Sequence, residues 1–107
     1  MEQNETLQTI SFSIILHAGN ARSLSMEAIE LAKEKKFDEA EKKIEEAGQE
    51  FTEAHHFQTQ LLQKESSGES QDISVILIHA QDHLMTSMVV KDMANAIIGL
   101  YKEIKGE

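Results

Sequence analysis

The chain has 107 residues, of which 40% are hydrophobic and 27% are charged, as expected for one globular domain spanning residues 1–107. Nineteen acidic residues against ten basic residues give a net charge of -9, which argues against nucleic acid or an anionic membrane as the main partner. Cysteine is absent, which excludes disulfides, thiolate metal sites and a cysteine nucleophile.

A first helix is predicted from about Thr6 to Lys35, because apolar and small residues recur there at helical spacing. Small residues in its middle allow a neighbouring helix to approach closely, although Gly19 costs about 1 kcal/mol in helix propensity. The stripe expected to face the core consists of Leu7, Ile10, Ile14, Ala18, Ala21, Ser25, Ala28 and Ala32.

A second helix is predicted after a turn at Lys36-Phe37. Asp38 precedes Glu41 by three positions, which is the spacing of a capping box with Asp38 as the N-cap. The Glu/Lys-rich side of this helix is expected to face solvent, and a Ser/Gly loop over residues 66–70 is expected to follow it. Its predicted inner stripe consists of Phe37, Ala40, Ile44, Ala47, Phe51, His55, Gln58 and Leu62.

A third helix is predicted to begin near Asp72 or Ile73 and to end near Lys105. It is apolar on nearly every side, which is typical of a helix that is covered all round. Short connections make consecutive helices antiparallel, so we expect an all-α, up-down-up three-helix bundle. Because two other helices cannot easily surround the third, we also expect self-association with this helix near the centre.

Targeting and membrane signals are not evident in the chain. The N-terminus has no basic segment followed by an apolar one, so no signal peptide is expected. The longest unbroken apolar run, Val75-Ile76-Leu77-Ile78, is far too short to span a bilayer. We therefore expect a cytoplasmic protein without direct membrane insertion.

A polar belt interrupts the apolar third helix, because His79, Asp82, His83 and Thr86 fall on one helical face. Polar groups in an apolar stripe lower stability unless they are paired or used. On spacing alone, His79 is more often a core histidine than a catalytic one. A zinc site is a further alternative, but His79, Asp82 and His83 supply only three ligands from one helix. The other histidines (His17, His55 and His56) are expected to be structural or solvent-facing.

The sequence from Leu77 to Thr86, LIHAQDHLMT, closely resembles the lactose/cellobiose-type IIA proteins of the bacterial phosphoenolpyruvate-dependent sugar phosphotransferase system. The similarity continues through Lys91-Asp92 to Tyr101, includes the run from Ala18 to Ser23, and covers essentially the whole chain. The resemblance implies a homotrimer of three-helix bundles. It implies that His79 accepts a phosphoryl group from phospho-HPr and passes it to a cysteine of the IIB component. The phosphoryl group then reaches a β-linked disaccharide such as lactose, cellobiose or chitobiose.

The resemblance also implies that Asp82 meets its two symmetry mates around one metal ion per trimer, and carboxylate oxygens favour Mg²⁺. His83 is expected either to orient His79 or only to pair within the belt. Gln81 lies away from the belt, and we expect it to support the site by reaching a phosphoryl group on a neighbouring subunit.

The proposed chemistry is plausible, because a neutral imidazole is a good nucleophile near the ordinary histidine pKa of about 6.5. Phosphoryl transfer needs mainly positioning and charge stabilisation. No Lys or Arg lies within one helical turn of His79 along the sequence, so the donor protein is expected to bring the positive charge.

Two rival interpretations belong to other functional classes. Residues 28–40 resemble the turn of a tetratricopeptide repeat, which suggests a non-catalytic helical interaction module, but no second copy of that unit is present. The other rival is a metal-binding three-helix protein.

Overall fold

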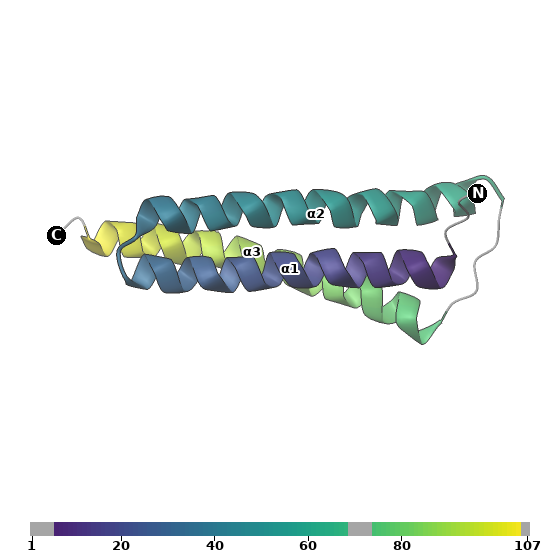
Figure 1. Cartoon of the computed structure of the whole chain (residues 1–107), viewed down its shortest axis with the longest axis horizontal. Coiled ribbons are helices and arrows are strands. Elements are labelled where there is room, and N and C mark those ends of the chain that lie inside the picture. The colour runs from purple at the N-terminus through teal and green to yellow at the C-terminus, as the bar shows by residue number, and fades with distance from the viewer. Residues whose placement is uncertain (1–5, 69–73, 106–107) are drawn as a thin grey trace.

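The computed structural model describes residues 6–68 and 74–105, which form three long helices and contain no strand. The helices are α1 (Leu7–Lys33), α2 (Phe37–Ser66) and α3 (Val75–Lys105). They run up, down and up in an elongated bundle of 58 × 24 × 20 Å (Figure 1). The predicted all-α, antiparallel three-helix bundle is therefore confirmed.

Helix α1 is the central element of this bundle. It packs extensively against both α2 and α3, whereas α2 and α3 contact each other much less. In Figure 1, α1 and α2 lie side by side along most of their length, and the start of α3 diverges from them. The position of α3 is therefore set mainly by α1.

The small-residue stripe of α1 explains this close packing. Every predicted core position from Ile10 to Ala32 is buried, and Leu7 is partly buried. Alanine and serine side chains let the neighbouring helices approach the α1 backbone, as close-packed interiors require. The main core cluster joins the first half of this stripe, Ile10 to Ala21, to Phe51 and Leu61 of α2 and to Ala80 and Leu84 of α3. Ala28 and Ala32 form a second cluster with Ala40 and Ile98.

Both ends of α1 have identifiable caps. The backbone N–H of Thr9 donates to Oγ1 of Thr6 at 3.1 Å, which satisfies one free donor of the first turn. At the other end, Lys35 adopts φ 66°, and the N–H of Lys36 donates to the carbonyl of Leu31 at 2.9 Å. This left-handed residue and hydrogen bond form a Schellman motif. It ends α1 at Lys33, two residues before the predicted end.

The predicted N-cap of α2 is wrong. The helix begins at Phe37, and Lys36 occupies the cap position without a side-chain capping hydrogen bond. The Schellman motif extends to Lys36, and α2 begins at the next residue. Asp38 therefore lies inside the first turn of α2 and cannot act as its N-cap. The carboxylate of Asp38 there still interacts favourably with the positive end of the helix dipole.

The inner stripe of α2 also differs from the prediction near its end. Leu61 is buried, whereas Leu62, which was predicted to face the core, is 55% exposed. The buried residues Ala40, Ala47, Ala54 and Leu61 recur every seven residues, which is the period of supercoiled helix packing. A stripe traced with the 3.6-residue period drifts away from this contact line by one residue over the length of α2.

The connection between α2 and α3 is described only in part. Ser66 is the last residue of α2, and Ser67 and Gly68 form a turn. The rest of the predicted loop, including Glu69 and Ser70, lies outside the described residues. So do Asp72 and Ile73, where α3 was predicted to begin.

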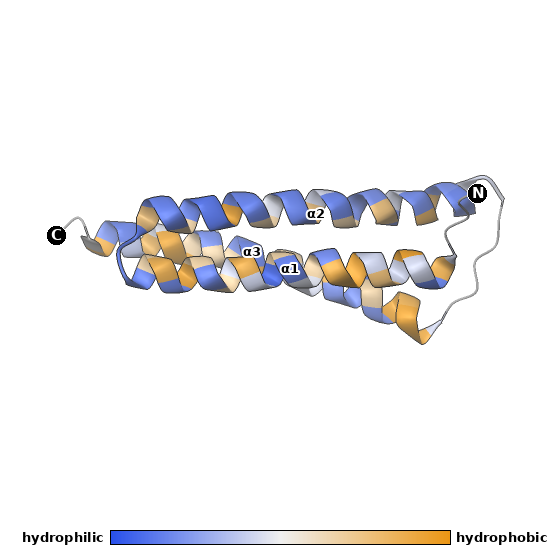
Figure 2. Ribbon diagram, viewed as in Figure 1, coloured by the Kyte–Doolittle hydropathy of each residue, from blue (hydrophilic) through white to orange (hydrophobic). Residues whose placement is uncertain are grey.

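One side of α3 carries apolar residues that the single chain does not cover. Figure 2 shows a largely hydrophilic α2 and a hydrophobic start of α3. The expected burial of α3 on every side is therefore not achieved within one chain. No helix of the described residues is long and apolar enough to cross a membrane. More than half of the surface is exposed for Val75, Ile78, Met85, Val89, Met93, Leu100 and Ile104.

Candidate functional site around His79

The motif residues of α3 point to different sides of the helix near its start. Ala80 and Leu84 are completely buried against the core. His79 and Asp82 are exposed, and His83 is half-buried. The arrangement therefore anchors α3 through its small and aliphatic residues while His79 remains open to a second protein.

The rings of His79 and His83 stack on each other. Their centroids lie 5.7 Å apart and their planes differ by 11°. His83 in turn approaches α1, since a Cβ atom built on Gly19 would lie 3.3 Å from Nε2 of His83. The exposed ring of His79 therefore stacks on the ring of His83, which itself packs against α1.

The environment of His83 favours its neutral form. Burial lowers the pKa of His83, and the nearby His79 and Arg22 lower it further, whereas Asp82 opposes them. His83 is therefore expected to be uncharged at neutral pH. A neutral imidazole can still form a hydrogen bond without adding charge beside His79.

Two residues of α1 escaped the sequence analysis of the site. Gly19 approaches His83, and Arg22 places a positive charge where it acts on His83. The search for a Lys or Arg within one helical turn of His79 covered only neighbours along the sequence. Arg22 was missed because it lies on another helix, α1. Both residues lie in the run from Ala18 to Ser23, to which the family resemblance points, and the small residues around Gly19 were a second signal, for a close helix approach.

Gln81 lies on the side of α3 that faces α2. Nε2 of Gln58 donates to Oε1 of Gln81 at 2.9 Å, and Oε1 of Gln58 lies 3.2 Å from Nδ1 of His55. The hydrogen bond between Gln58 and Gln81 links α2 to α3, two helices that otherwise contact each other little. The structure does not bring Gln81 to His79 within one chain, and its reach to a neighbouring subunit stays a prediction.

Asp82 lies in the middle of the uncovered apolar stripe of α3. Residues Val75, Ile78, Asp82, Met85 and Val89 are separated by alternating steps of three and four, as in the contact line of a coiled coil. The nearby Thr86 hydroxyl donates to the backbone carbonyls of Asp82 and His83, at 2.9 and 3.3 Å, and so serves the helix backbone.

A metal ion at Asp82 would require more than one chain. Among the described residues of a single chain, no group of three or more histidine, aspartate or glutamate side chains is placed to hold a metal. This argues against a zinc site made by one helix from His79, Asp82 and His83. The carboxylate of Asp82 nevertheless has the hard oxygen donors that suit Mg²⁺, and its side chain is exposed in the single chain.

The histidines outside the motif lie elsewhere in the bundle. Nδ1 of His17 is 2.8 Å from Oε1 of Glu50, and the His17 ring stacks on Phe57 with centroids 5.9 Å apart. The exposed His56 lies edge-on to Phe57 within α2. The two contacts of His17 join α1 to α2 and give His17 a structural role.

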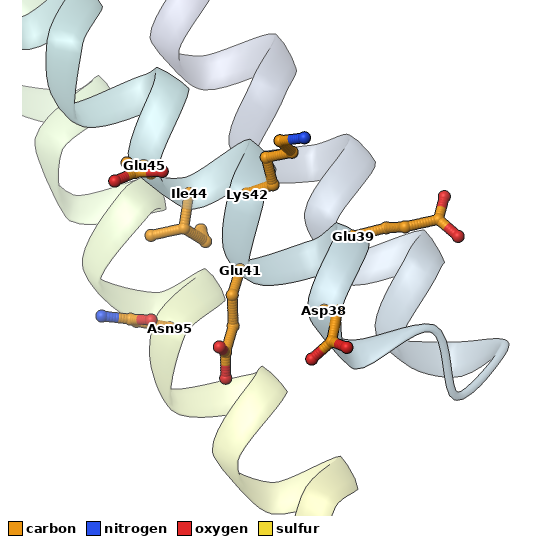
Figure 3. Close-up of a pocket in the computed structure, with 7 residues that line it drawn as sticks. All are labelled: Asp38, Glu39, Glu41, Lys42, Ile44, Glu45 and Asn95. Atoms are coloured by element: carbon orange, nitrogen blue, oxygen red, sulfur yellow. The ribbon is translucent and has the colours of Figure 1, made fainter.

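A wide hollow lies between the start of α2 and the later part of α3, away from His79. It has a volume of about 740 Å³ and is lined mainly by carboxylates, as Figure 3 shows. Such a surface repels a phosphoryl group, so it is not a second phosphoryl-binding site. Its lining residues are Asp38, Glu39, Glu41, Lys42, Ile44, Glu45 and Asn95.

The residue pattern has direct counterparts among known proteins. Residues 9–102 match the family model described as the PTS system, Lactose/Cellobiose specific IIA subunit. The chain belongs to this IIA family. The lichenan-specific phosphotransferase enzyme IIA component of Bacillus subtilis (strain 168) is 52% identical to it over 101 residues, which cover 94% of this chain and 92% of the relative.

Solved structures of IIA proteins agree with this assignment. The cellobiose-specific enzyme IIA from Bacillus anthracis superposes with a TM-score of 0.91 at 48% identity, covering 95% of this chain and 94% of that one. A IIA(Chitobiose) chain, solved with HPr from the Escherichia coli phosphotransferase system, gives a TM-score of 0.79 at 32% identity, covering 95% and 99%. This IIA protein is thus a phosphotransferase component that works as a phosphohistidine carrier, and the rival interaction module is not favoured.

Proposed function

We propose that His79 is the residue of this IIA protein that carries the phosphoryl group. The observation that supports it best is the exposed imidazole of His79, held against His83 on a helix whose opposite side is anchored in the core. Outside the motif, His17 is engaged in joining α1 to α2, whereas His55 and His56 contact residues of their own helix α2. His79 therefore combines accessibility with a defined ring position.

In the proposed reaction, a ring nitrogen of neutral His79 attacks the phosphorus atom of phospho-HPr. The new N–P bond forms as the bond between phosphorus and the donor atom breaks, and the donor leaves with that electron pair. The donor protein supplies positive charge for the equatorial oxygens. The IIB component then takes the phosphoryl group from His79 in the same manner.

HPr and IIB are the proposed partners of this chain. The solved complex of a IIA(Chitobiose) protein with HPr supports HPr as the donor. A β-linked disaccharide is the proposed final acceptor, and the relatives' names, which mention lichenan, cellobiose and chitobiose, support that class. A cytoplasmic location belongs to the same proposal, because the carrier must meet its donor and its acceptor in one compartment.

A homotrimer with α3 at its centre is also proposed. The uncovered stripe of α3 would be buried against its symmetry mates, and apolar patches of that extent usually mark contact surfaces. One Mg²⁺ per trimer, held by Asp82 of each subunit, would neutralise three carboxylates brought together on the axis. His83 and Gln81 would support the site, the first through its stack on His79.

Phosphate uptake tests the central proposal. The protein is incubated with phosphoenolpyruvate, enzyme I and HPr, and the bound phosphate is counted by intact-protein mass spectrometry. We expect one phosphate per chain that survives base and is lost in acid. The variant His79→Ala should take up none, whereas His17→Ala, His55→Ala and His56→Ala should remain competent. Labelling of His79→Ala would refute the assignment.

A further inference from the structure

Gly19 is a glycine inside a helix without an obvious backbone reason. It lies in α1 between Ala18 and Asn20, and its φ is not in the positive range that favours glycine. A glycine in a helix interior is less favourable than alanine by about 1 kcal/mol. The reason for glycine at this position is therefore expected in the space around it.

That space is occupied by His83. A Cβ atom on Gly19 would lie 3.3 Å from Nε2 of His83, closer than ordinary van der Waals contact, so the histidine would have to move by a few tenths of an ångström. Gly48 and Gly99 differ from Gly19 in this respect. A Cβ on Gly48 would meet only Cε of Lys91, at 3.8 Å, and a Cβ on Gly99 would meet nothing within 4 Å.

We infer that Gly19 is a positioning residue for phosphoryl transfer, because it gives His83 the room to seat against α1 and so to hold the stacked ring of His79. This inference rests on the proposed role of His79 as phosphoryl acceptor. Gly19 touches neither donor nor phosphoryl group, and it acts through His83.

The packing around His83 explains why its displacement would reach His79. Ala80 and Leu84, which flank His83 on the same helix, are completely buried, so α3 as a whole cannot easily shift away from α1. The displacement therefore falls on the His83 side chain, whose ring is stacked on His79 at a centroid distance of 5.7 Å. Phosphoryl transfer depends strongly on the position of the attacking atom.

The first test compares Gly19→Ala with Gly48→Ala and Gly99→Ala, which make the same chemical change in helices. Phosphate transfer from phospho-HPr to each variant is followed by rapid quench. We expect Gly19→Ala to slow the transfer about threefold to tenfold, while the two controls stay within about twofold of the parent. An unchanged rate for Gly19→Ala, or an equal loss in the controls, would overturn the inference.

The second test separates positioning from a general structural effect. In a His83→Ala background, the added methyl group has no ring to displace, so Gly19→Ala should cause no further loss of rate. The same loss in both backgrounds would contradict the inference. If Gly19→Ala alone fails to fold by circular dichroism, the double variant Gly19→Ala/His83→Ala should recover the helical signal, and failure to recover it counts against the inference.

A third measurement does not depend on phosphorylation. In ¹H–¹³C NMR spectra, the ring resonances of both His79 and His83 should shift in Gly19→Ala and stay in place in Gly99→Ala. Unmoved His79 resonances would overturn the inference even if His79 is confirmed as acceptor. If neither the parent nor any variant takes up phosphate on His79, the proposed function fails. The NMR spectra would still decide whether Gly19 positions the rings of His79 and His83.

Discussion

Nδ1 of His17 on α1 and Oε1 of Glu50 on α2 lie 2.8 Å apart, and the side chain of Asn20 donates to the same oxygen at 3.3 Å. The hydrogen bond with His17 lowers the pKa of the Glu50 carboxyl below its ordinary value, and the Asn20 contact adds to this effect. The ionised carboxylate of Glu50 thus helps to hold α1 and α2 together.

This pair predicts a pH-dependent contribution to stability. Because the folded-state pKa of Glu50 is lowered, its stabilising effect is complete above the ordinary carboxyl pKa and is lost as pH falls through the folded value. We expect Glu50→Gln to be less stable than the parent by about 0.2–1 kcal/mol near pH 7. Urea unfolding should show the difference shrinking in acid, and a pH-independent difference would contradict the prediction.

Two adjacent leucines of α2 test the contact line of the bundle. Leu61 is 6% exposed and Leu62 is 55% exposed. Truncation of a buried leucine removes apolar contacts and leaves a cavity, so Leu61→Ala should destabilise the protein by about 2–4 kcal/mol. Leu62→Ala should stay within about 0.5 kcal/mol. Thermal unfolding of both variants measures this, and equal losses would show that the contact line is misplaced.

The uncovered stripe of α3 predicts the oligomeric state. Sedimentation equilibrium should give about three times the chain mass of 12.0 kDa. Val89→Asp places a charge in the stripe, where burial between subunits is unfavourable, and should weaken the trimer. As a control, Asn95→Asp adds the same charge at an exposed position of α3 in the acidic hollow, and this variant should not weaken the trimer. A parent protein that is monomeric at micromolar concentration would refute the trimer.

Asp82 should behave as a structural residue of the trimer. Three converging carboxylates repel one another, so a chelator should weaken the trimer, and mild acid should partly replace the metal by protonating a carboxylate. Asp82→Leu removes both the repulsion and the need for the ion. We expect this variant to be trimeric, free of metal and at least as stable as the parent.

The same variant separates structural from catalytic roles of Asp82. Asp82→Leu should still accept phosphate on His79, because its carboxylate is proposed to act on the axis rather than at the transfer site. Metal analysis and phosphate counting on the purified trimer measure both properties. Retained metal, or loss of phosphorylation in an intact trimer, would assign Asp82 to the phosphoryl-transfer site instead.

Much of this protein could be predicted from the sequence, because helices and their buried faces depend on local periodicity. Every predicted core position of α1 from Ile10 to Ala32 is buried, although the buried Ser11 was not predicted, and the motif around His79 was sufficient to indicate the family. Both signals are carried by residues close together along the chain. Periodicity also predicted an apolar α3 that one chain cannot cover.

The tertiary structure decided what depends on how one helix sits against another. The Schellman turn at Lys35 placed Asp38 inside α2, and the heptad contact line buried Leu61 in place of Leu62. The approach of Gly19 to His83, and the link from Gln58 to Gln81, join residues on different helices. Such contacts depend on the axial position and rotation of each helix relative to the next. Those quantities follow from the packing of the whole core, and no local spacing in the sequence specifies them.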